Sequence, residues 1–245
     1  IKDNLIELSS GLTGSAVKDS GIIIERGDAK YQSVIQKILM KYRPKYIFHL
    51  AALPLAKLDN LNSEEALEGS VLSTTNIINS IVNLNRLNNY KPKKFIYASS
   101  SMVYGDFKKP TIDENHSTNP KEIYGTMKLA GETVTKGLCE FYNINYNIVR
   151  PSAVYGPSDM NRRVSQIFIE KALSNKTINI QGKDETLDFT FVKDTANGFV
   201  LSATNSRVNN QIFNITYGKA QSLLKFAQTL KKFIPGLKFK ISPRD

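Results

Sequence analysis

The sequence predicts an α/β fold, with a doubly wound parallel sheet and a smaller C-terminal subdomain built onto it. In the first half, short and almost continuously apolar runs alternate with longer segments whose apolar residues recur at helical spacing. After Pro151 the runs become shorter and the pattern changes. Apolar strands separated by helices are typical of a parallel sheet covered on both faces. With 245 residues, 41% of them hydrophobic, the chain can bury one sizeable core or two small ones.

The first half is expected to contain four strands and three helices. Strands are predicted at 21–25, 46–50, 95–98 and 146–150, and helices at 31–42, 64–88 and 124–142. The long second helix carries an apolar stripe from Leu67 to Leu84. Because ligands bind at the carboxyl ends of parallel strands, the residues that follow these strands should face one crevice. They are Ala51-Ala52, Ser99-Ser100-Ser101 and Pro151-Ser152.

The second half is expected to contain shorter elements. Helices are predicted at 162–173, 195–204 and 222–233, and strands at 177–181, 189–192 and 211–216. Asp194 is expected to cap the helix that starts at Thr195. The first domain is therefore assigned to 1–155, joined by about 188–217, and the smaller subdomain to 156–187 and 218–245. No linker separates the two, so we expect them to share an interface.

Composition excludes several classes of protein. The 33 Lys and Arg against 22 Asp and Glu give a net charge of +11, which would suit nucleic acid or an anionic membrane. However, no aromatic and basic stacking array accompanies the charge, so a solvated lysine-rich surface is favoured. A single cysteine, Cys139, and two histidines exclude a disulfide framework and a Cys- or His-based metal site. No apolar run approaches the roughly 20 residues of a membrane span. We expect a cytoplasmic protein without metal, membrane or nucleic-acid partner.

A tyrosine four residues before a lysine places both side chains on one helix face. The ammonium charge then lowers the pKa of the phenol from about 10, which makes a base that works near neutral pH. Three such pairs occur, but a proline interrupts Tyr90–Lys94, and Tyr104–Lys108 lies in a turn. Only Tyr124–Lys128 opens a long helix, downstream of the serine run that ends a strand.

Six motifs follow one another in an order that resembles a known family. They are Glu-Arg-Gly-Asp28, His49-Leu-Ala-Ala52, Ser99-Ser-Ser-Met-Val-Tyr-Gly105, Pro120-x-x-x-Tyr124-x-x-x-Lys128, Arg150-Pro-Ser-Ala-Val-Tyr-Gly-Pro157 and Asp188-Phe-x-x-Val-x-Asp194. The order resembles extended short-chain dehydrogenases/reductases, and more closely the NAD-dependent epimerase/dehydratase group. The resemblance implies a Rossmann-type sheet, a substrate-binding subdomain, NAD as cofactor and a nucleotide-sugar substrate. It also implies a homodimer formed through a four-helix bundle of the helices at about 64–86 and 124–142.

The resemblance also implies roles for individual residues. Tyr124 would be the base, Lys128 would activate it and hold the nicotinamide ribose, and Ser100 would bind the reacting oxygen. Cofactor contacts would come from Asp3, Asn4, Asp28, Ala29, Leu50, Ala51, Ala52 and Pro151, together with Tyr124 and Lys128. Substrate contacts would come from Ser101, Met102, Ala153, Arg162 and Arg163. For Ser99 and Ser101 loop polarity is the competing interpretation, which we favour for both, and for the two arginines it is an exposed helix start.

The resemblance also explains the beginning of the chain. Asp3-Asn4-Leu5 resembles the end of the family's second strand, and a glycine-rich phosphate loop lies roughly 20 residues before the acidic residue of a dinucleotide fold. Gly11-Leu-Thr-Gly14 is not this loop, because too few residues separate it from the strand at 21–25 for a crossover helix. We therefore expect the first strand, glycine loop and helix to lie outside this chain, and the small subdomain to continue beyond Asp245.

One departure from the family's motifs bears on the reaction. Dehydratases of the family carry Asp-Glu directly after the catalytic Ser or Thr, where this chain has Ser101-Met102. This argues against 4,6-dehydration and predicts an NAD-dependent nucleotide-sugar epimerase, acting at C4 of a hexose or hexuronate. Two alternatives stay open: an NAD(P)-dependent reductase or dehydrogenase, and a non-catalytic relative that binds RNA or protein. We interpret His49 as a core histidine and His116 as a solvated one.

Overall fold

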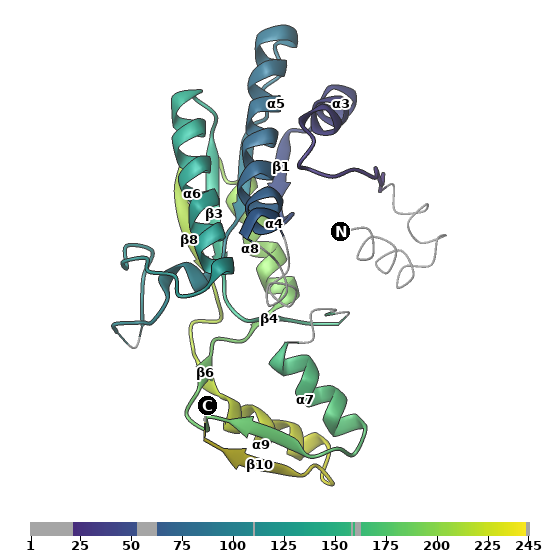
Figure 1. The fold of residues 1–245 in the computed structure, drawn as a ribbon, viewed down its shortest axis with the longest axis vertical. Helices are drawn as coiled ribbons and strands as arrows, with labels where there is room; N and C mark the ends of the chain where they lie inside the picture. Colours follow the sequence, from purple (N-terminus) through teal and green to yellow (C-terminus); the bar gives the residue numbers. More distant parts are fainter. Residues whose placement is uncertain (1–21, 53–62, 110, 158, 160–162, 244–245) are drawn as a thin grey trace. The chain divides into compact units, whose positions relative to one another are not determined.

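A computed structural model describes residues 22–52, 63–109, 111–157, 159 and 163–243. The chain divides into two compact units (Figure 1). The first comprises Ile1–Arg150 and Phe199–Phe213, and the second comprises Pro151–Gly198 and Asn214–Asp245. The expected segments 156–187 and 218–245 fall within the second unit.

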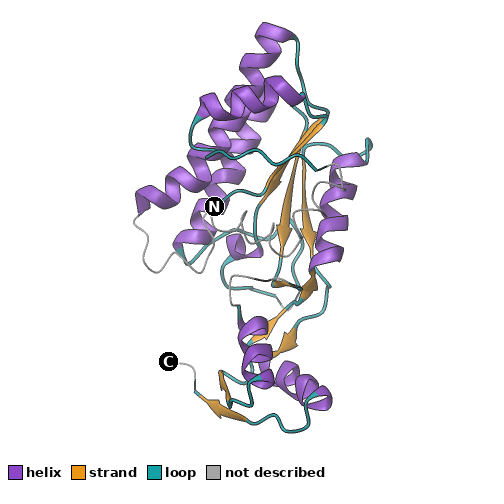
Figure 2. Cartoon of the chain, turned by 90° about the vertical axis from the view of Figure 1, so that its right-hand side faces the viewer, coloured by secondary structure: helices purple, strands orange, loops and turns teal. Residues whose placement is uncertain are grey.

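The first unit is built on a four-stranded sheet with the order β1-β2-β3-β8 (strands orange in Figure 2). The strands are β1 (Tyr46–His49), β2 (Lys94–Ala98), β3 (Tyr146–Pro151) and β8 (Gln211–Ile215). β2 runs parallel to β1, with Tyr97 opposite His49, and parallel to β3, with Ala98 opposite Val149. All five residues of β2 are buried. The carboxyl ends of three parallel strands therefore meet at one edge, as the sequence predicts.

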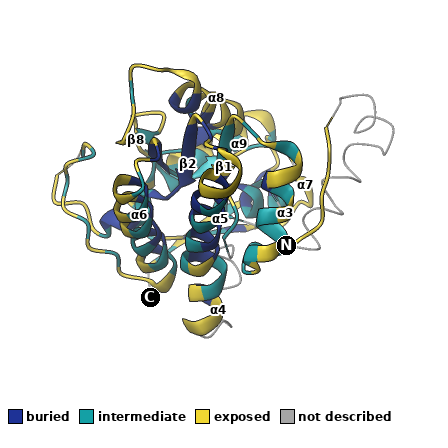
Figure 3. Cartoon of the chain, turned by 90° about the horizontal axis from the view of Figure 1, so that it is seen from above, coloured by how far each residue is buried: buried dark blue, intermediate teal, exposed yellow. Residues whose placement is uncertain are grey.

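Helices cover both faces of this sheet (Figure 3). On one face lie α3 (Gln32–Tyr42), α5 (Ser73–Asn88) and α6 (Ile123–Phe141), and on the other lies the end of α8 (Val192–Thr204). The core under the first face is the cluster of buried apolar side chains Leu39, Ile77, Ile78, Ile81, Val82, Leu84, Tyr90, Phe95, Tyr97, Cys139, Ile144, Tyr146 and Ile148. The expected doubly wound sheet is confirmed.

One expectation about the first unit is wrong, and a second is confirmed with one difference. No strand forms at residues 22–25, because no described strand pairs with them, and Ile22, Ile23 and Ile24 are 56%, 66% and 45% exposed. The long helix expected at 64–88 is not uniform. It begins as α4 (Ser63–Leu67), widens into a π-helical segment, η2 (Glu68–Leu72), and continues as α5. Single π-helical turns within helices are often found at functional sites.

The second unit contains pairs of short strands and two helices that pack over a common core. β4 (Val154–Tyr155) runs parallel to β7 (Thr190–Phe191), and β5 (Ile178–Gln181) runs parallel to β10 (Phe239–Ser242). β6 (Thr186–Leu187) and β9 (Gln221–Ser222) are antiparallel. The helices α7 (Val164–Leu173) and α9 (Leu223–Phe233) pack over a core of Phe168, Ala172, Ile178, Ile180, Ala227 and Leu237.

The sequence predicts the start of α9 (Leu223–Phe233) correctly but misplaces the start of α8. Ser222 caps α9, because its side chain accepts a hydrogen bond of 3.1 Å from Lys225 N, and this start agrees with the expected one. Asp194 does not cap a helix. α8 begins at Val192, directly after β7, so Asp194 lies in the first turn, where a carboxylate still favours the positive end of the helix dipole.

Within the described parts of the chain, none of the helices combines the length and the apolar composition that crossing a bilayer requires.

Candidate active site

The turn after β2 presents Ser100 at the carboxyl edge of the sheet. Ser99 and Ser100 follow Ala98 and lead into a 3-10 turn, η3 (Ser101–Tyr104), and Ser100 is in extended conformation. Ser100 caps this turn, because its Oγ accepts a hydrogen bond of 3.2 Å from Met102 N. The backbone hydrogen bonds of η3 therefore fix the orientation of the Ser100 hydroxyl.

The first turn of α6 packs tightly against η3 through Gly125. A Cβ at Gly125 would lie 2.7 Å from the Met102 carbonyl oxygen and 3.0 Å from Pro120 Cβ, so a larger residue would push the helix away. Tyr124 precedes this glycine in the chain and is half-buried. The close approach brings the beginning of α6, with Tyr124, beside the turn that carries Ser100.

Lys128 lies one helical turn after Tyr124 and is 3% exposed. Its Nζ donates a hydrogen bond of 2.7 Å to the carbonyl oxygen of Ala98, the last residue of β2. The ammonium lies 5.7 Å from the centroid of the Tyr124 ring and 5.4 Å from that of Tyr97. Burial lowers the pKa of Lys128 to about 8, and the charge of Glu132 partly opposes this shift. The expected pairing of Tyr124 with Lys128 is thus present, and it is anchored to the end of β2.

His49 is a buried core histidine, as expected. It is 3% exposed, and its Nε2 lies 2.9 Å from Thr74 Oγ1 and 3.4 Å from Ser73 Oγ. Burial, with a smaller contribution from the Lys128 charge, lowers its pKa to about 3, so the ring is neutral. It therefore adds no charge next to Lys128.

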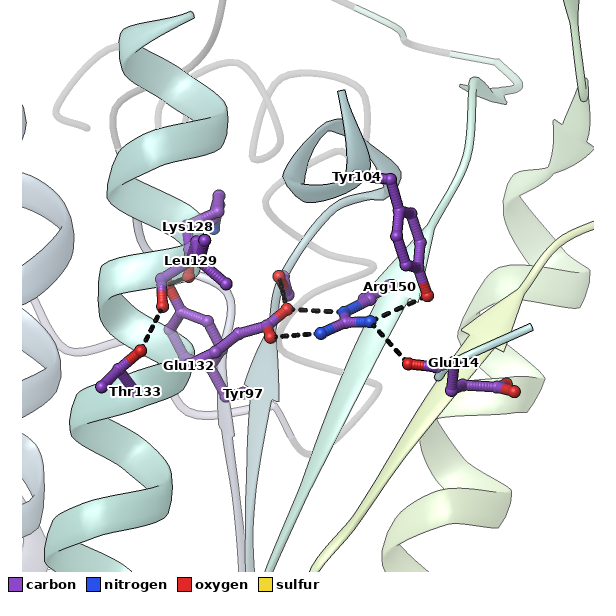
Figure 4. A network of polar contacts seen from close by, with 9 residues as sticks. Tyr97, Tyr104, Glu114, Lys128, Leu129, Glu132, Thr133 and Arg150 are labelled. Carbon is purple, nitrogen blue, oxygen red and sulfur yellow. Dashed lines mark hydrogen bonds and ion pairs between the residues drawn. The ribbon is translucent and has the colours of Figure 1, made fainter. Parts of the chain in front are cut away.

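The sequence analysis missed a group of buried polar residues that lies near Lys128 (Figure 4). Ser99, which we interpreted as loop polarity, is 3% exposed and donates a hydrogen bond to Glu132, one turn after Lys128. Glu132 in turn forms an ion pair with Arg150. Arg150 is a charged residue in a fully buried part of a strand, which requires a partner. A charged residue in an apolar strand therefore indicates a buried acidic partner, but it does not identify Glu132 as that partner.

Besides Tyr124 and Lys128, the described cofactor residues predicted in the first unit lie in two loops, one after β1 and one before α3. Leu50, Ala51 and Ala52 directly follow β1, and Leu50 is 62% exposed. Asp28 belongs to the turn before α3, where its Oδ1 accepts a hydrogen bond of 2.9 Å from Lys30 N. The carbonyl oxygen of Ala29 accepts one of 3.3 Å from Asn76 Nδ2 on α5. Asp3 and Asn4 lie outside the described residues.

The predicted substrate residues divide between the units. Ser101 and Met102 form the first turn of η3 beside Ser100 and are half-buried. Ala153 and Arg163 belong to the second unit, where Arg163 Nη1 donates a hydrogen bond of 3.4 Å to Val154 O and Ala153 takes a φ of 31°. Pro151, a predicted cofactor residue, belongs to the same unit. Arg162 lies outside the described residues.

We expected His116 to be solvated, but the structure shows it partly buried. Its ring packs edge-on against Tyr104 and Phe107, with centroids 5.9 and 6.4 Å away, and its Nε2 is buried. Aromatic residues at and after the end of η3 pack against this ring. The polar residues around His116 in the sequence did not indicate this packing.

Comparison with known proteins identifies the family. Residues 4–216 match the family described as NAD dependent epimerase/dehydratase. The chain belongs to this family. The resemblance drawn from the six motifs is therefore confirmed.

Curated relatives within the family carry names from two activities. A Methanocaldococcus jannaschii protein named "Putative UDP-glucose 4-epimerase" is 35% identical over 161 residues, which cover 64% of this chain and 52% of that protein. A Dictyostelium discoideum dTDP-D-glucose 4,6-dehydratase is 23% identical over 214 residues, or 82% of this chain and 48% of that protein. The chain spans about half the length of these curated relatives.

Solved structures share the fold. A UDP-glucose 4-epimerase from Thermotoga maritima, with UDP-glucose, has a TM-score of 0.81 at 22% identity, covering 92% of this chain and 73% of that one. A UDP-glucuronic acid 4-epimerase from Bacillus cereus, in complex with UDP-glucuronic acid and NAD, also has a TM-score of 0.81 at 22% identity, covering 96% and 74%. At these identities the likeness establishes the fold, which is the Rossmann-type α/β fold expected from the sequence.

Proposed function

We propose that this chain belongs to an NAD-dependent nucleotide-sugar epimerase that inverts C4 of a hexose or hexuronate. The observation that carries the proposal is the pairing of Tyr124 with a buried Lys128 at the end of β2, next to the turn that holds Ser100. Family membership and the names of the relatives support the same activity. The proposal concerns the whole protein, and the chain spans about half the length of the curated relatives that it matches.

The donor set at Lys128 fits the nicotinamide ribose of NAD. A lysine ammonium has three N–H donors, and among the described residues Lys128 Nζ has a single acceptor, Ala98 O. With the side chain almost wholly buried, ribose hydroxyl oxygens are suitable acceptors for the remaining donors. Asp28, Ala29, Leu50, Ala51, Ala52 and Pro151 remain the proposed residues for the rest of the dinucleotide. When bound, NAD would supply the hydride acceptor and donor for the sugar carbon.

The side chains supply the proton chemistry. Tyr124, as a phenolate stabilised by the Lys128 ammonium, takes the proton of the C4 hydroxyl and returns it after the sugar has turned its other face. Ser100 Oγ accepts from Met102 N, so its hydroxyl hydrogen is available to donate to the reacting oxygen of the sugar. Both groups act on the same oxygen, which requires the close packing of α6 on η3.

The turn after β2 favours epimerisation over dehydration. Elimination of water needs an acid and a base close to the sugar, and the two residues after Ser100 are Ser101 and Met102. Neither titrates in the physiological range, so the dehydratase names among the relatives do not transfer to this chain. Ser101 and Met102, with Ala153, Arg162 and Arg163, remain proposed contacts of the nucleotide sugar.

We also propose a homodimer, paired through the helices at about 64–86 and 124–142. Apolar side chains that lie exposed on these helices support it: Leu67, Leu72 and Ile123 are 48%, 39% and 44% exposed. Sedimentation of the full-length protein measures the assembly directly, and a monomer would contradict it. The cytoplasmic location stays a prediction.

The experiment incubates the full-length protein with NAD and UDP-glucose or UDP-glucuronate, and identifies the products by NMR. We expect the C4 epimer to appear without net NADH. Net accumulation of NADH would contradict the epimerase assignment and favour a dehydrogenase. The Tyr124→Phe variant should lose turnover by roughly 10²- to 10⁴-fold, because it removes the base, while it still binds NAD.

Tyr142→Phe is the matched control, because Tyr142 follows the other end of the same helix. It should keep the wild-type rate. Unchanged turnover in Tyr124→Phe would refute the assigned base.

A further inference from the structure

Glu132 and Arg150 form the centre of a cluster of buried polar groups, with Lys128 one helical turn before Glu132 (Figure 4). Arg150 Nε donates a hydrogen bond of 2.8 Å to Glu132 Oε1, and Arg150 Nη2 donates one of 2.6 Å to Glu132 Oε2. The Ser99 hydroxyl also donates to Glu132 Oε1. The two charged side chains are only 4% and 6% exposed. Both carboxylate oxygens are therefore engaged, which leaves Glu132 no role as a proton acceptor.

The remaining guanidinium nitrogen of Arg150 extends the cluster to η3 and to the loop that contains Glu114. Arg150 Nη1 donates hydrogen bonds of 2.8 Å to the Tyr104 hydroxyl oxygen and 3.3 Å to the carbonyl oxygen of Glu114. Its guanidinium also lies 4.7 Å from the centroid of the Tyr104 ring. We call Ser99, Tyr104, Glu114, Glu132 and Arg150 the Glu132–Arg150 cluster.

Members of the cluster adjoin all three candidate catalytic residues along the chain. Ser99 immediately precedes Ser100, and Tyr104 ends the 3-10 turn that Ser100 caps. Glu132 follows Lys128 by four residues and Tyr124 by eight, so the three share one face of α6. The cluster thus joins α6, the end of β2, the end of β3 and η3, which are the elements that set the geometry of the site.

We propose that Glu132, held by Arg150 and Ser99, is a positioning residue that fixes the placement of Ser100, Tyr124 and Lys128 and the charge environment of Lys128. The proposal deepens the proposed function, on which the catalytic roles of Ser100, Tyr124 and Lys128 rest. A buried ion pair is seldom more stabilising than well-packed apolar side chains of similar size. Geometry, rather than stability, is therefore the reason for placing two charges here.

The charge of Glu132 bears directly on Lys128. The groups that face the Lys128 ammonium are Tyr97 from β2, Tyr124 and Glu132 from α6, and His49 from β1. His49 is neutral, so Glu132 is the group that opposes the effect of burial on the pKa of Lys128. Loss of the Glu132 charge should therefore favour the neutral amine at a lower pH.

The first experiment replaces the pair by apolar side chains of similar length, E132M with R150M, in the full-length protein. Folding stability should stay close to that of the wild type. The kcat should fall about 10²-fold, because small misplacements of reacting groups carry losses of that size, while KM and NAD affinity change little. A double variant that folds and keeps the wild-type kcat would overturn the proposal, since the pair would then be structural only.

The second experiment follows the titration of Lys128 by NMR in protein with labelled lysines, assigned with K128M. In Glu132→Gln the midpoint should move to lower pH, and the alkaline limb of kcat should move with it. Glu140→Gln is the matched control: it makes the same change on the same helix, where Glu140 accepts a hydrogen bond of 3.0 Å from Tyr146, and it should leave the midpoint in place. An unchanged midpoint in Glu132→Gln would count against the proposal.

Two further outcomes are separated by this design. If Glu132→Gln does not fold because Arg150 is left unpaired, the stability and kcat of the double variant decide the proposal, because that variant removes both charges together. An inactive wild-type protein would contradict the proposed function alone, since the titration of Lys128 needs no substrate and still decides whether Glu132 controls its charge.

Discussion

The two ends of β2 each hold a buried lysine ammonium, and the two lysines are bound in different ways. At the amino end, Lys94 Nζ donates hydrogen bonds of 3.0, 2.9 and 2.6 Å to the carbonyl oxygens of Ser202, Asn205 and Val208. At the carboxyl end, Lys128 Nζ has the single described acceptor Ala98 O, at 2.7 Å. Both lysines are 3% exposed, and burial lowers the pKa of both.

The difference separates a structural cation from a functional one. Lys94 places its charge at the end of α8, where orphan carbonyls and the negative end of the helix dipole favour a cation. All three of its donors are used, so it has none left for a ligand. Lys128 keeps donors for a ligand and has an acid, Glu132, near it instead of a helix terminus. A buried lysine with unused donors is the more informative sign of a binding site.

The largest expected effect is on turnover, in Lys128→Met. We expect kcat to fall about 10³-fold, because the phenolate of Tyr124 loses the cation that stabilises it. Folding stability should stay equal or rise, since the variant removes a buried charge. Steady-state kinetics and urea unfolding of the full-length protein measure the two effects. A stable variant with wild-type kcat would refute the functional role assigned to Lys128.

The next effect is on stability, in Lys94→Met. We expect the free energy of unfolding to fall by about 2 to 3 kcal/mol, because the end of α8 loses its cation and Asn205 O loses its donor. The loss is limited because Asn147 Nδ2 still donates to Ser202 O and Val208 O, at 2.8 and 3.2 Å. Since Lys94 lies about 13 Å from Ala98 along the strand, kcat of the folded protein should not change. A lower kcat with unchanged stability would reverse the assigned roles.

The sequence predicted the site better where its signals are local. The spacing of Tyr124 and Lys128 on one helix, and the serine run after a buried strand, follow from periodicity within single elements. The acceptors of Lys94 lie 108 to 114 residues further along the chain, and Ser99 and Glu132 are separated by 33 residues. Such pairings depend on how the elements pack, which residue spacing does not encode.

The same contrast applies to the fold. Apolar runs predicted the paired strands of the first unit, because burial on both faces leaves a continuous pattern. The run at 21–25 has that pattern too, yet residues 22–25 form no strand, since strand formation also needs a neighbour. The spacing of apolar residues along the long helix did not predict the π-helical segment η2. Local composition thus predicts which segments are capable of pairing, and the tertiary structure decides which of them do.

The smallest effect is a pH dependence of stability that Lys128 alone should cause. Its pKa is about 8 in the folded protein, against about 10.4 for an unperturbed lysine in the unfolded chain. Between these values the unfolded chain holds a proton that the folded protein has released, so stability should rise with pH, by at most about 1.4 kcal/mol per pH unit. Below pH 8 both states hold the proton, and the cost of burying the charge is fully present.

Urea unfolding of wild type and Lys128→Met between about pH 7 and pH 9.5 measures this contribution, and the same pair in a Tyr124→Phe background removes the titration of Tyr124, which depends on the Lys128 charge. We expect the wild type to gain stability relative to the variant as pH rises through about 8, over the range in which kcat should decline with the loss of the ammonium. Equal slopes in the two proteins would mean that Lys128 keeps an ordinary pKa. The expected opposition of activity and stability follows from burying a cation whose donors are kept for a ligand.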